Sequence, residues 1–483
     1  MSLRVLVVAS ECAPLVKVGG LGDVVGSLPA ALRREGVDAR VLLPGYPAVI
    51  DALGADPAAV TVPPYAGLPQ ARVLAGEGPG GAPLYAIDCP SLYARPGTPY
   101  QDARGTEWRD NPLRFALLAH VAALFGRDGA PHGWTCDVVH ANDWQAGLAP
   151  AYLALGPAPR AATLFTIHNL AFQGLCEPSW MTAVGLPAQA WSMHGVEYHG
   201  QLSFMKAGLY YADAISTVSP TYAREITSAP LGMGFEGLLA ARASDLHGIL
   251  NGIDDEAWDP RTDPLIVAHY EPATLLRKVR NRVALSKRLG LVPRDDVPLF
   301  GLVSRFSPQK GIDLVLAIAD ALVALPAQLV LAGTGDRELE VGALDCAARH
   351  PGQVGAFVGF DEGIAHLLEA SADCFLMPSR FEPCGMNQMY SQRYGTPPIV
   401  HGTGGLVDSV TDVDDATLAN GTGWVFRPAS SAALLNKVRQ AAQLWHNRRA
   451  WRRVQRNGMA RDFSWRASAR QYARLYARLA ERA

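Results

Sequence analysis

The sequence predicts an α/β protein built from two doubly wound halves of similar size. Short apolar runs, typical of buried parallel strands, alternate with helix-like segments in both halves of the chain. Polar residues and glycines recur just after these runs, at the sheet edge where ligands bind in open α/β folds. At 483 residues the chain is also too long for one ordinary domain, so two or three domains are expected.

The first half opens with a βαβ unit. Helices are predicted at 24–35, with Asp23 as the N-cap, and at 113–125. Residues 46–112 are rich in Pro, Gly and Ala and are expected to be less regular. The strands expected in this half, each from a short apolar run, cover residues 3–9, 39–43, 137–140, 163–167 and 214–218.

The alternation restarts in the second half, after a segment at 245–264 that has no clear period and is expected to be a linker. A helix is predicted near 271–289, and the tail carries Tyr472, Leu475, Tyr476 and Leu479 on one helical stripe. We therefore expect a C-terminal helix that packs back on the body of the protein. The strands expected in this half cover residues 298–303, 328–332, 354–358, 374–377 and 398–400.

Composition and charge exclude several classes of protein. The net charge of -2 gives no electrostatic case for nucleic acid or a membrane surface. The seven cysteines are odd in number and form no C-x-x-C pair, which favours reduced thiols, with Cys384 as a small buried hydrophobe. No apolar stretch reaches membrane-spanning length, and the N-terminus lacks a signal-peptide pattern, so we expect a cytoplasmic protein.

The stretch Pro378-Ser-Arg-Phe-Glu-Pro-Cys-Gly-Met-Asn-Gln388 contains the strongest functional signal. It follows an apolar run, and Pro383 and Gly385 form a turn before a helix that is expected to open at Met386. Such a turn presents backbone N–H groups to an anion. Glu382 precedes the turn, where a carboxylate suits sugar or ribose hydroxyls. With the second turn at Gly402-Thr-Gly-Gly405, the pattern predicts a site for a phosphorylated, hydroxyl-rich ligand.

Cations accompany these turns. Arg305 and Lys310 lie five residues apart after a predicted strand, where a rigid fork and a point charge can clamp a diphosphate. Lys17, flanked by glycines, is a third candidate from the other half of the chain. The sequence shows no carboxylate cluster to bind a metal, so no metal cofactor is expected.

A dinucleotide-binding oxidoreductase fits poorly. Gly20 and Gly22 stand about ten residues after the first predicted strand, whereas the Rossmann phosphate turn is tight. The second predicted strand ends Leu43-Pro-Gly45, with no acidic residue for a ribose hydroxyl. A P-loop, a serine nucleophile elbow and H-E-x-x-H are all absent.

The ordered motifs of the chain resemble bacterial glycogen synthases, a family that includes plant starch synthases. Phe463-Ser-Trp465 and the tyrosine-rich tail also look like the family, so the resemblance spans nearly the whole chain. The motifs that carry it are Lys17-Val-Gly-Gly-Leu-Gly-Asp23, Asn142-Asp-Trp144, Thr166-Ile-His-Asn169, Asn251-Gly-Ile-Asp254, Ser304-Arg-Phe-Ser-Pro-Gln-Lys-Gly311, Pro378-Ser-Arg-Phe-Glu-Pro-Cys-Gly385 and Thr403-Gly-Gly405.

The resemblance implies two facing Rossmann-like domains with a cleft between them, the GT-B arrangement. Residues 1–250 would form the acceptor-side domain of the starch synthase catalytic type. Residues 251–483 would form the donor-side domain, with the terminal helix at 463–483. The implied reaction transfers glucose from ADP-glucose to the 4-hydroxyl at the non-reducing end of an α-1,4-glucan, as in glycogen biosynthesis, with retention of the α configuration. Glycogen and ADP-glucose are the implied partners.

The resemblance also implies roles for single residues. Arg305 and Lys310 would neutralise the departing diphosphate, and Glu382 would bind glucose hydroxyls. With His168, these three are the implied catalytic residues. The other implied donor-site residues are Lys17, Gly19 and Gly20 from the first domain, His168, Asp143 and Asn251 around the glucose, and Gly385, Met386, Asn387, Thr403 and Gly404 around the phosphate and ribose.

Three positions depart from the family pattern. Gln145 stands where His is frequent, Met386-Asn-Gln388 replaces the usual Leu-Thr-Gln, and His401 stands where Arg is common. Two alternatives remain open: a glucosyltransferase with a small acceptor such as glucose 1-phosphate, and a non-catalytic glucan-binding protein. The presence of Lys17, Arg305, Lys310 and Glu382 speaks against the second alternative.

Overall fold

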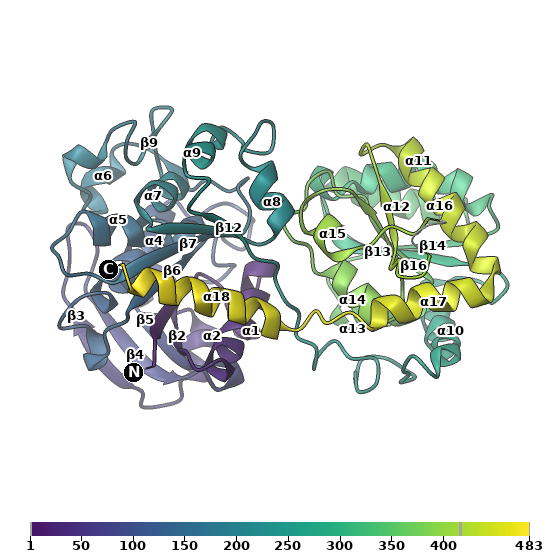
Figure 1. Ribbon diagram of the computed structural model, residues 1–483, viewed down its shortest axis with the longest axis horizontal. Coiled ribbons are helices and arrows are strands. Elements are labelled where there is room, and N and C mark those ends of the chain that lie inside the picture. The colour runs from purple at the N-terminus through teal and green to yellow at the C-terminus, as the bar shows by residue number, and fades with distance from the viewer. Residues whose placement is uncertain (1, 415–417, 483) are drawn as a thin grey trace. The chain divides into compact units, whose positions relative to one another are not determined.

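The computed structural model describes residues 2–414 and 418–482, and the chain divides into two compact units. Unit 1 comprises Met1–Gly252 together with Ser464–Ala483, and unit 2 comprises Ile253–Phe463. Each unit is built around its own sheet, mixed in unit 1 and parallel in unit 2, with helices on both faces (Figure 1). In the described part of the chain, no helix is both long enough and apolar enough to cross a membrane.

The sheet of unit 1 has the strand order β12-β11-β7-β6-β1-β2-β5-β4-β3. The strands from β12 to β5 pair in parallel, and β4 and β3 extend the sheet as an antiparallel edge. The strands are β1 (Arg4–Val8), β2 (Asp38–Pro44), β3 (Ala58–Val62), β4 (Ala71–Glu77), β5 (Pro83–Asp88), β6 (Val138–Asn142), β7 (Ala162–Ile167), β11 (Ala214–Thr217) and β12 (Leu246–Gly248).

The helices of unit 1 cover both faces of this sheet. A small separate sheet joins β8 (Leu175–Cys176), β10 (Gln201–Ser203) and β9 (Glu197–Tyr198). The helices are α1 (Gly20–Arg34), α2 (Pro47–Ala52), α3 (Pro90–Tyr93), α4 (Asn111–Phe125), α5 (Leu148–Ala154), α6 (Trp180–Ala183), α7 (Phe204–Tyr211), α8 (Pro220–Glu225), α9 (Glu236–Ala241) and α18 (Trp465–Ala480).

The sheet of unit 2 is parallel throughout, in the order β15-β14-β13-β16-β17-β18. Its strands are β13 (Leu299–Phe306), β14 (Gln328–Gly335), β15 (Val354–Val358), β16 (Cys374–Met377), β17 (Pro398–His401) and β18 (Trp424–Phe426). Its helices are α10 (Lys278–Leu289), α11 (Ile312–Val323), α12 (Arg337–Arg349), α13 (Glu362–Ser371), α14 (Asn387–Arg393), α15 (Gly404–Ser409), α16 (Ser431–His446) and α17 (Arg448–Met459).

The unbroken apolar runs of the sequence become the central strands, because helices on both faces of a parallel sheet bury the middle of each strand on both sides. Val5–Val8 of β1 and Leu329–Leu331 of β14 are no more than 1% exposed. The carboxyl ends of these strands carry the polar loops on which the candidate site is built.

The C-terminal tail corrects the predicted domain division. Residues 464–483 belong to unit 1, whereas the sequence placed them in the second domain. Figure 1 shows α18, in yellow, lying beside α1 and β6, and it buries Trp465, Tyr472 and Tyr476 there. The apolar stripe predicts that the helix is buried, but a stripe carries no information about which sheet covers it.

Three other local predictions were wrong. The helix α1 begins at Gly20, so Asp23 lies in its first turn, where a carboxylate favours the positive end of the helix dipole. The expected linker begins too early, because β12 pairs with β11 inside unit 1. The segment at 46–112 was expected to be less regular but contains the strands β3, β4 and β5. The Pro and Gly residues around these strands obscure their alternation of apolar and polar residues.

Candidate functional site

An ion pair lies at the centre of the loops that follow the strands of unit 2. Lys310 Nζ lies 2.6 Å from Glu382 Oε2, and Ser379 Oγ donates a hydrogen bond of 2.9 Å to the same oxygen. The Glu382 side chain is 7% exposed and that of Lys310 is 19% exposed. A buried carboxylate needs such partners, because moving the unpaired charge out of water costs roughly several kcal/mol. The pair therefore fixes the Glu382 carboxylate at this sheet edge.

The two loops that carry this pair are tied together by their backbones. The Arg380 N–H donates to the Gln309 carbonyl at 2.8 Å, and Gln309 Nε2 donates to the Phe381 carbonyl at 3.3 Å. Gly311 has φ +68°, and a Cβ there would lie 2.2 Å from the Pro378 carbonyl oxygen. The loops after β13 and β16 thus form one double-loop structure.

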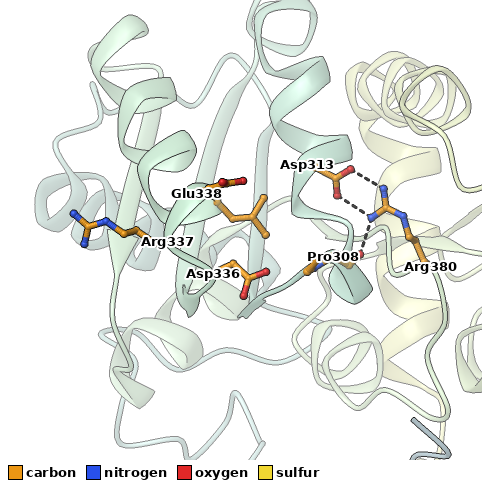
Figure 2. A pocket seen from close by; sticks show the side chains of 7 residues that line it. Pro308, Asp313, Asp336, Arg337, Glu338 and Arg380 are labelled. Atoms are coloured by element: carbon orange, nitrogen blue, oxygen red, sulfur yellow. Dashed lines mark hydrogen bonds and ion pairs between the residues drawn. The ribbon is translucent and has the colours of Figure 1, made fainter. Parts of the chain in front are cut away.

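Arg380 is a structural member of this double loop. Its guanidinium donates to both carboxylate oxygens of Asp313, at 2.8 and 2.6 Å, and to the Pro308 carbonyl at 2.6 Å. Figure 2 shows this pair at one side of a pocket of about 450 Å³, with Asp336 and Glu338 on the other side. A bidentate pair of this kind orients both loops and leaves little of the Arg380 charge for a ligand.

Arg305 differs from Lys310 and Arg380, which are both paired with a carboxylate. It lies near the carboxyl end of β13 and is exposed, and within the described residues its guanidinium makes no hydrogen bond or ion pair. Its five donors are therefore available to an anion at this edge of the sheet. The sequence predicted Arg305 and Lys310 as a diphosphate clamp, and the structure places them at the same strand end.

Glycines pack the next turn directly against the backbone of Glu382. Gly404 has φ +46°, and a Cβ there would lie 1.9 Å from the Glu382 carbonyl oxygen. The Gly405 N–H donates to the carbonyls of Glu382 and Pro383, both at 3.2 Å. Only glycine permits this approach, so Thr403 and Gly404 are brought next to the double loop by steric necessity.

The predicted phosphate-side residues follow directly. Gly385 has φ +69°, Met386 caps α14, and Asn387 Nδ2 donates to the Val303 carbonyl of β13 at 2.9 Å. The Asn387 side chain therefore anchors the start of α14 to β13. The Asn387 side chain is thus occupied within the protein, so any contact of Asn387 with a ligand would have to come from its backbone.

In unit 1 the glycine-rich loop before α1 is held by a carboxylate that the sequence did not single out. Glu11 accepts hydrogen bonds from the N–H groups of Val18 at 2.6 Å and Gly19 at 2.9 Å, and from the Tyr100 hydroxyl. Burial raises the pKa of Glu11, and these donors oppose the rise. Lys17, which projects from the loop, pairs with Asp23 at 2.7 Å and remains 45% exposed.

Asp143 and His168 are joined at the carboxyl ends of β6 and β7. The Asp143 carboxylate accepts hydrogen bonds from the backbone N–H groups of His168 and Asn169, yet burial raises its pKa to about 8. Its φ of +59° is strained for a residue with a side chain. His168 Nε2 lies 3.0 Å from Asn142 Oδ1, and burial lowers the pKa of His168 to about 3.

Three buried carboxyl or amide oxygens of unit 1 have no protein partner among the described residues. They are Asp143 Oδ1, Gln145 Oε1 and Asn251 Oδ1. An unpaired buried acceptor costs about 1–3 kcal/mol, so such atoms call for a donor from outside the protein. Sugar hydroxyls are donors of this kind, and two of the three residues were predicted from the sequence.

The predicted site residues thus form two groups, one in each unit. Lys17, Gly19, Gly20, Asp143, His168 and Asn251 belong to unit 1, and Arg305, Lys310, Glu382, Gly385, Met386, Asn387, Thr403 and Gly404 belong to unit 2. The structure brings Lys310 to Glu382 and Asp143 to the backbone of His168. Sequence reasoning missed Glu11, Ser379 and Arg380; each precedes or lies within a glycine-containing loop, which was the available signal.

The architecture of the two units defines the fold class of the chain. Each is a doubly wound domain, and unit 2 carries Lys310 paired with the buried carboxylate of Glu382 at the carboxyl ends of its strands. The fold is similar to that of a sucrose-phosphate synthase from Thermosynechococcus elongatus, with a TM-score of 0.61 at 19% identity over 100% of both chains. The chain therefore has the GT-B fold.

Closer relatives specify the family. Residues 4–241 match the family described as starch synthase catalytic domain, and residues 287–458 match glycosyl transferases group 1. The glycogen synthase of Dechloromonas aromatica is 51% identical, with 98% of each chain covered, and that of Aromatoleum aromaticum is 53% identical, with 98% and 96% covered. The chain belongs to the bacterial glycogen synthase family.

A solved structure agrees with this assignment. The catalytic domain of starch synthase IV from Arabidopsis thaliana, bound to ADP and acarbose, has a TM-score of 0.87 at 32% identity. The match covers 100% of both chains. The predictions of the family, the GT-B fold and glycosyltransferase activity are thereby confirmed.

The raised pKa of Asp143 predicts a pH-dependent stability. The folded protein retains the Asp143 proton up to about pH 8, whereas the unfolded chain loses it near 3.8. The free energy of unfolding should therefore fall between these values, by up to about 1.4 kcal/mol per pH unit for this one proton. Urea unfolding of the wild type and of Asp143→Asn at several pH values measures the difference.

The Asp143→Asn protein should lack this component of the slope. Asp128→Asn, which neutralises an exposed carboxylate of the same unit, should keep the wild-type slope. Identical slopes for Asp143→Asn and the wild type would show that Asp143 is ionised in the folded protein.

Gly404→Ala should disrupt the support of Glu382. The new Cβ would meet the Glu382 carbonyl, and the backbone conformation alone costs roughly 1–3 kcal/mol for a non-glycine residue. We expect a lower Tm and a large loss of kcat. Gly237→Ala is the control, because a Cβ there has open space within helix α9 and should leave Tm unchanged or raised. A wild-type Tm for Gly404→Ala would contradict the steric argument.

Proposed function

We propose that this chain elongates α-1,4-glucans by transferring glucose from ADP-glucose to the 4-hydroxyl at the non-reducing end, with retention of configuration. The observation that carries the proposal is the Lys310–Glu382 pair at 2.6 Å, set in the double loop with exposed Arg305 at the same strand end. Kinship with glycogen synthases, and with a starch synthase solved with ADP and acarbose, supports the choice of donor and acceptor.

The donor side of the proposal is electrostatic. The bond between the glucose C1 and the diphosphate oxygen breaks, and negative charge grows on the leaving ADP. Arg305 and Lys310 neutralise that charge, each contributing about 3–4 kcal/mol by analogy with oxyanion donors. In this proposal the side-chain cations act without a metal. The acceptor 4-hydroxyl oxygen forms the new bond to C1, and its proton passes to the leaving diphosphate and from there to solvent.

Glu382 binds glucose hydroxyls in this proposal. Its Oε2 is occupied by Lys310 and Ser379, so the carboxylate is fixed before the sugar arrives. A carboxylate accepts hydrogen bonds only, which matches the donors that a sugar ring presents. The Lys310 side chain thereby links the two parts of the donor, because it touches the sugar-binding carboxylate and carries charge for the diphosphate.

The remaining donor contacts are assigned by the same chemistry. The Gly385, Met386 and Asn387 backbone, with Thr403 and Gly404, binds phosphate and ribose. From unit 1, His168, Asp143 and Asn251 bind glucose hydroxyls, supported by the unpaired acceptors of Asp143 and Asn251. Lys17, with Gly19 and Gly20, binds the donor; Gly19 has open space where a Cβ would stand.

The acceptor belongs to unit 1 in this proposal. A pocket of about 850 Å³ there is lined by Trp108, Trp144, Phe172, Trp180 and Phe204, interspersed with polar Asn111, Gln173 and Glu177. Aromatic faces suit the apolar faces of glucose rings, and the polar groups suit their hydroxyls. Because the seven cysteines form no disulfide in the part of the chain that the structure describes, we place the enzyme in the reducing cytoplasm.

The donor is tested by kinetics. With a glycogen primer, kcat/KM should be higher for ADP-glucose than for UDP-glucose, and glucose 1-phosphate should not replace the primer. Release of ADP and lengthening of the glucan measure the two halves of the reaction. Equal or reversed donor preference would refute ADP-glucose, and transfer to glucose 1-phosphate alone would refute the glucan acceptor.

The roles of the unit 2 residues are separable by substitution. Arg305→Ala and Lys310→Ala should each lower kcat by roughly 10²–10³, because the charge on the diphosphate grows in the transition state. Glu382→Gln keeps the size of the side chain and should also lower kcat, because an amide holds the glucose less well. Arg305→Ala should in addition weaken the binding of ADP alone, measured by calorimetry.

ADP lacks the glucose, so Glu382→Gln should bind it nearly as the wild type does. Arg294→Ala is a matched control for the loss of one exposed arginine of unit 2, since Arg294 pairs only with the exposed Asp296 in the described structure. If Glu382→Gln weakened ADP as much as Arg305→Ala, the separate sugar and diphosphate roles would be wrong.

A further inference from the structure

A row of hydrogen-bonded polar side chains crosses the apolar core of unit 1. The Tyr476 hydroxyl of α18 lies 2.8 Å from His140 Nδ1, and His140 Nε2 lies 2.6 Å from Thr166 Oγ1. Thr166 Oγ1 lies 2.5 Å from Ser216 Oγ. All four side chains are 0% exposed. We call Tyr476, His140, Thr166 and Ser216 the buried row.

Such a row is costly in an apolar core unless every member is paired. Its neighbours on the same sheet, such as Leu164 and Ile215, are apolar and fully buried. An unpaired polar group there costs about 1–3 kcal/mol, whereas apolar residues of the same shape carry no such cost. A packing role alone would therefore be served better by apolar side chains.

The proton positions follow from the charge state of His140. Burial lowers the pKa of His140 to about 3, and the nearby His168 contributes to the decrease, so the ring is neutral. A neutral imidazole has one donor and one acceptor nitrogen. Because a phenol is a stronger donor than an aliphatic hydroxyl, we assign the Tyr476 O–H as donor to Nδ1, and the His140 Nε2–H as donor to Thr166.

The buried row lies one layer beneath the candidate site. On β6, His140 and Asn142 are two residues apart and share a face of the sheet. Asn142 Nδ2 donates to the His140 carbonyl at 3.1 Å, which turns Oδ1 toward His168 Nε2 at 3.0 Å. On β7, Thr166 likewise precedes His168 by two residues. The Asn142–His168 contact therefore rests on the layer that contains His140 and Thr166.

We propose that Tyr476 is a positioning residue for glucosyl transfer: through His140 it fixes the layer on which Asn142 orients His168. The inference rests on the proposed function, in which His168 contacts the donor glucose. It gives the C-terminal helix a role beyond covering the sheet. Without the Tyr476 hydroxyl, the acceptor Nδ1 of His140 is left unpaired, and the ring must turn or take up a proton beneath His168.

The kinetic test is a double-mutant cycle. We expect Tyr476→Phe to lower kcat by about tenfold, through misplacement of His168, with the KM for ADP-glucose changed by less than about twofold. In the His168→Ala background, the same substitution should change kcat by less than about twofold, because the residue through which it acts is gone. Independent, multiplicative losses in kcat would overturn the proposal.

Leu479→Ala is the matched control for helix packing. Leu479 lies on the same buried face of α18, one turn after Tyr476, and has no polar group. It should lower Tm while kcat stays within about twofold of the wild type. A parallel loss of kcat in Leu479→Ala would mean that any loosening of α18 is sufficient, which would overturn a specific role for the hydroxyl.

Nuclear magnetic resonance of ¹⁵N-histidine-labelled protein tests the same coupling without substrate. Tyr476→Phe should shift the ring nitrogens of both His140 and His168, whereas Leu479→Ala should shift neither. A shift confined to His140 would overturn the inference even if the enzyme is otherwise as proposed. A shift at His168 in a protein that transfers no glucose would instead refute the proposed function and leave the coupling intact.

A second variant tests the proposal if Tyr476→Phe does not fold. If Tyr476→Phe gave no folded protein, Ser216→Ala would remove the partner at the other end of the row and should shift the same two histidines. An unshifted His168 in folded Ser216→Ala would overturn the proposal.

Discussion

The ion pair between Lys310 and Glu382 is the interaction on which the donor edge of unit 2 depends. The pair brings together two loops that are 72 residues apart in the chain. Both partners are largely withdrawn from water, so their attraction is screened less than that of a surface pair. Removing either partner would leave the other charge poorly solvated. The hydrogen bonds of Arg380 and Gln309 hold the two loops together and so keep the partners of the pair in contact.

In unit 1, buried carboxyl groups are held by hydrogen bonds from backbone N–H groups instead of by a lysine. Glu11 and Asp143 are both buried carboxyl groups, and each accepts hydrogen bonds from N–H groups of a loop that follows a strand. Backbone donors carry only partial charges, so burial prevails and raises the pKa of both groups. In unit 2 a full positive charge takes this place, because Lys310 Nζ lies 2.6 Å from Glu382 Oε2. The two units therefore present chemically different carboxyl groups to a ligand.

The sequence predicted the central strands well, because burial on both faces leaves an unbroken apolar run. The run predicted at 354–358 corresponds to β15 and that at 374–377 to β16, with the same bounds. The edge strand β3 was missed, since most of its residues are exposed and carry no periodic signal. The partner of α18 could not be predicted either, because an apolar stripe fits any apolar surface.

The candidate site was predictable in composition but not in contacts. Lys310 and Glu382 were singled out as separate groups for diphosphate and sugar, and no sequence pattern indicates that they pair. Arg380 and Arg305 look alike in sequence, each an arginine in a loop after a strand. Only the fold distinguishes them, by giving Arg380 the Asp313 carboxylate and leaving Arg305 exposed.

The glycines show why the motifs nevertheless pointed to the correct edge of the sheet. Gly311, Gly404 and Gly405 each stand where a Cβ would collide with a carbonyl oxygen of the loop at 378–384, at 2.2, 1.9 and 2.3 Å. Glycine occurs at these positions because three backbone segments pack closely around one carboxylate. A loop packed that closely cannot relax when a ligand arrives, so Glu382 is held in place by sterics as well as by charge. The glycine pattern and the Lys310–Glu382 pair are thus two consequences of the same constraint, the convergence of the strand ends of β13, β16 and β17.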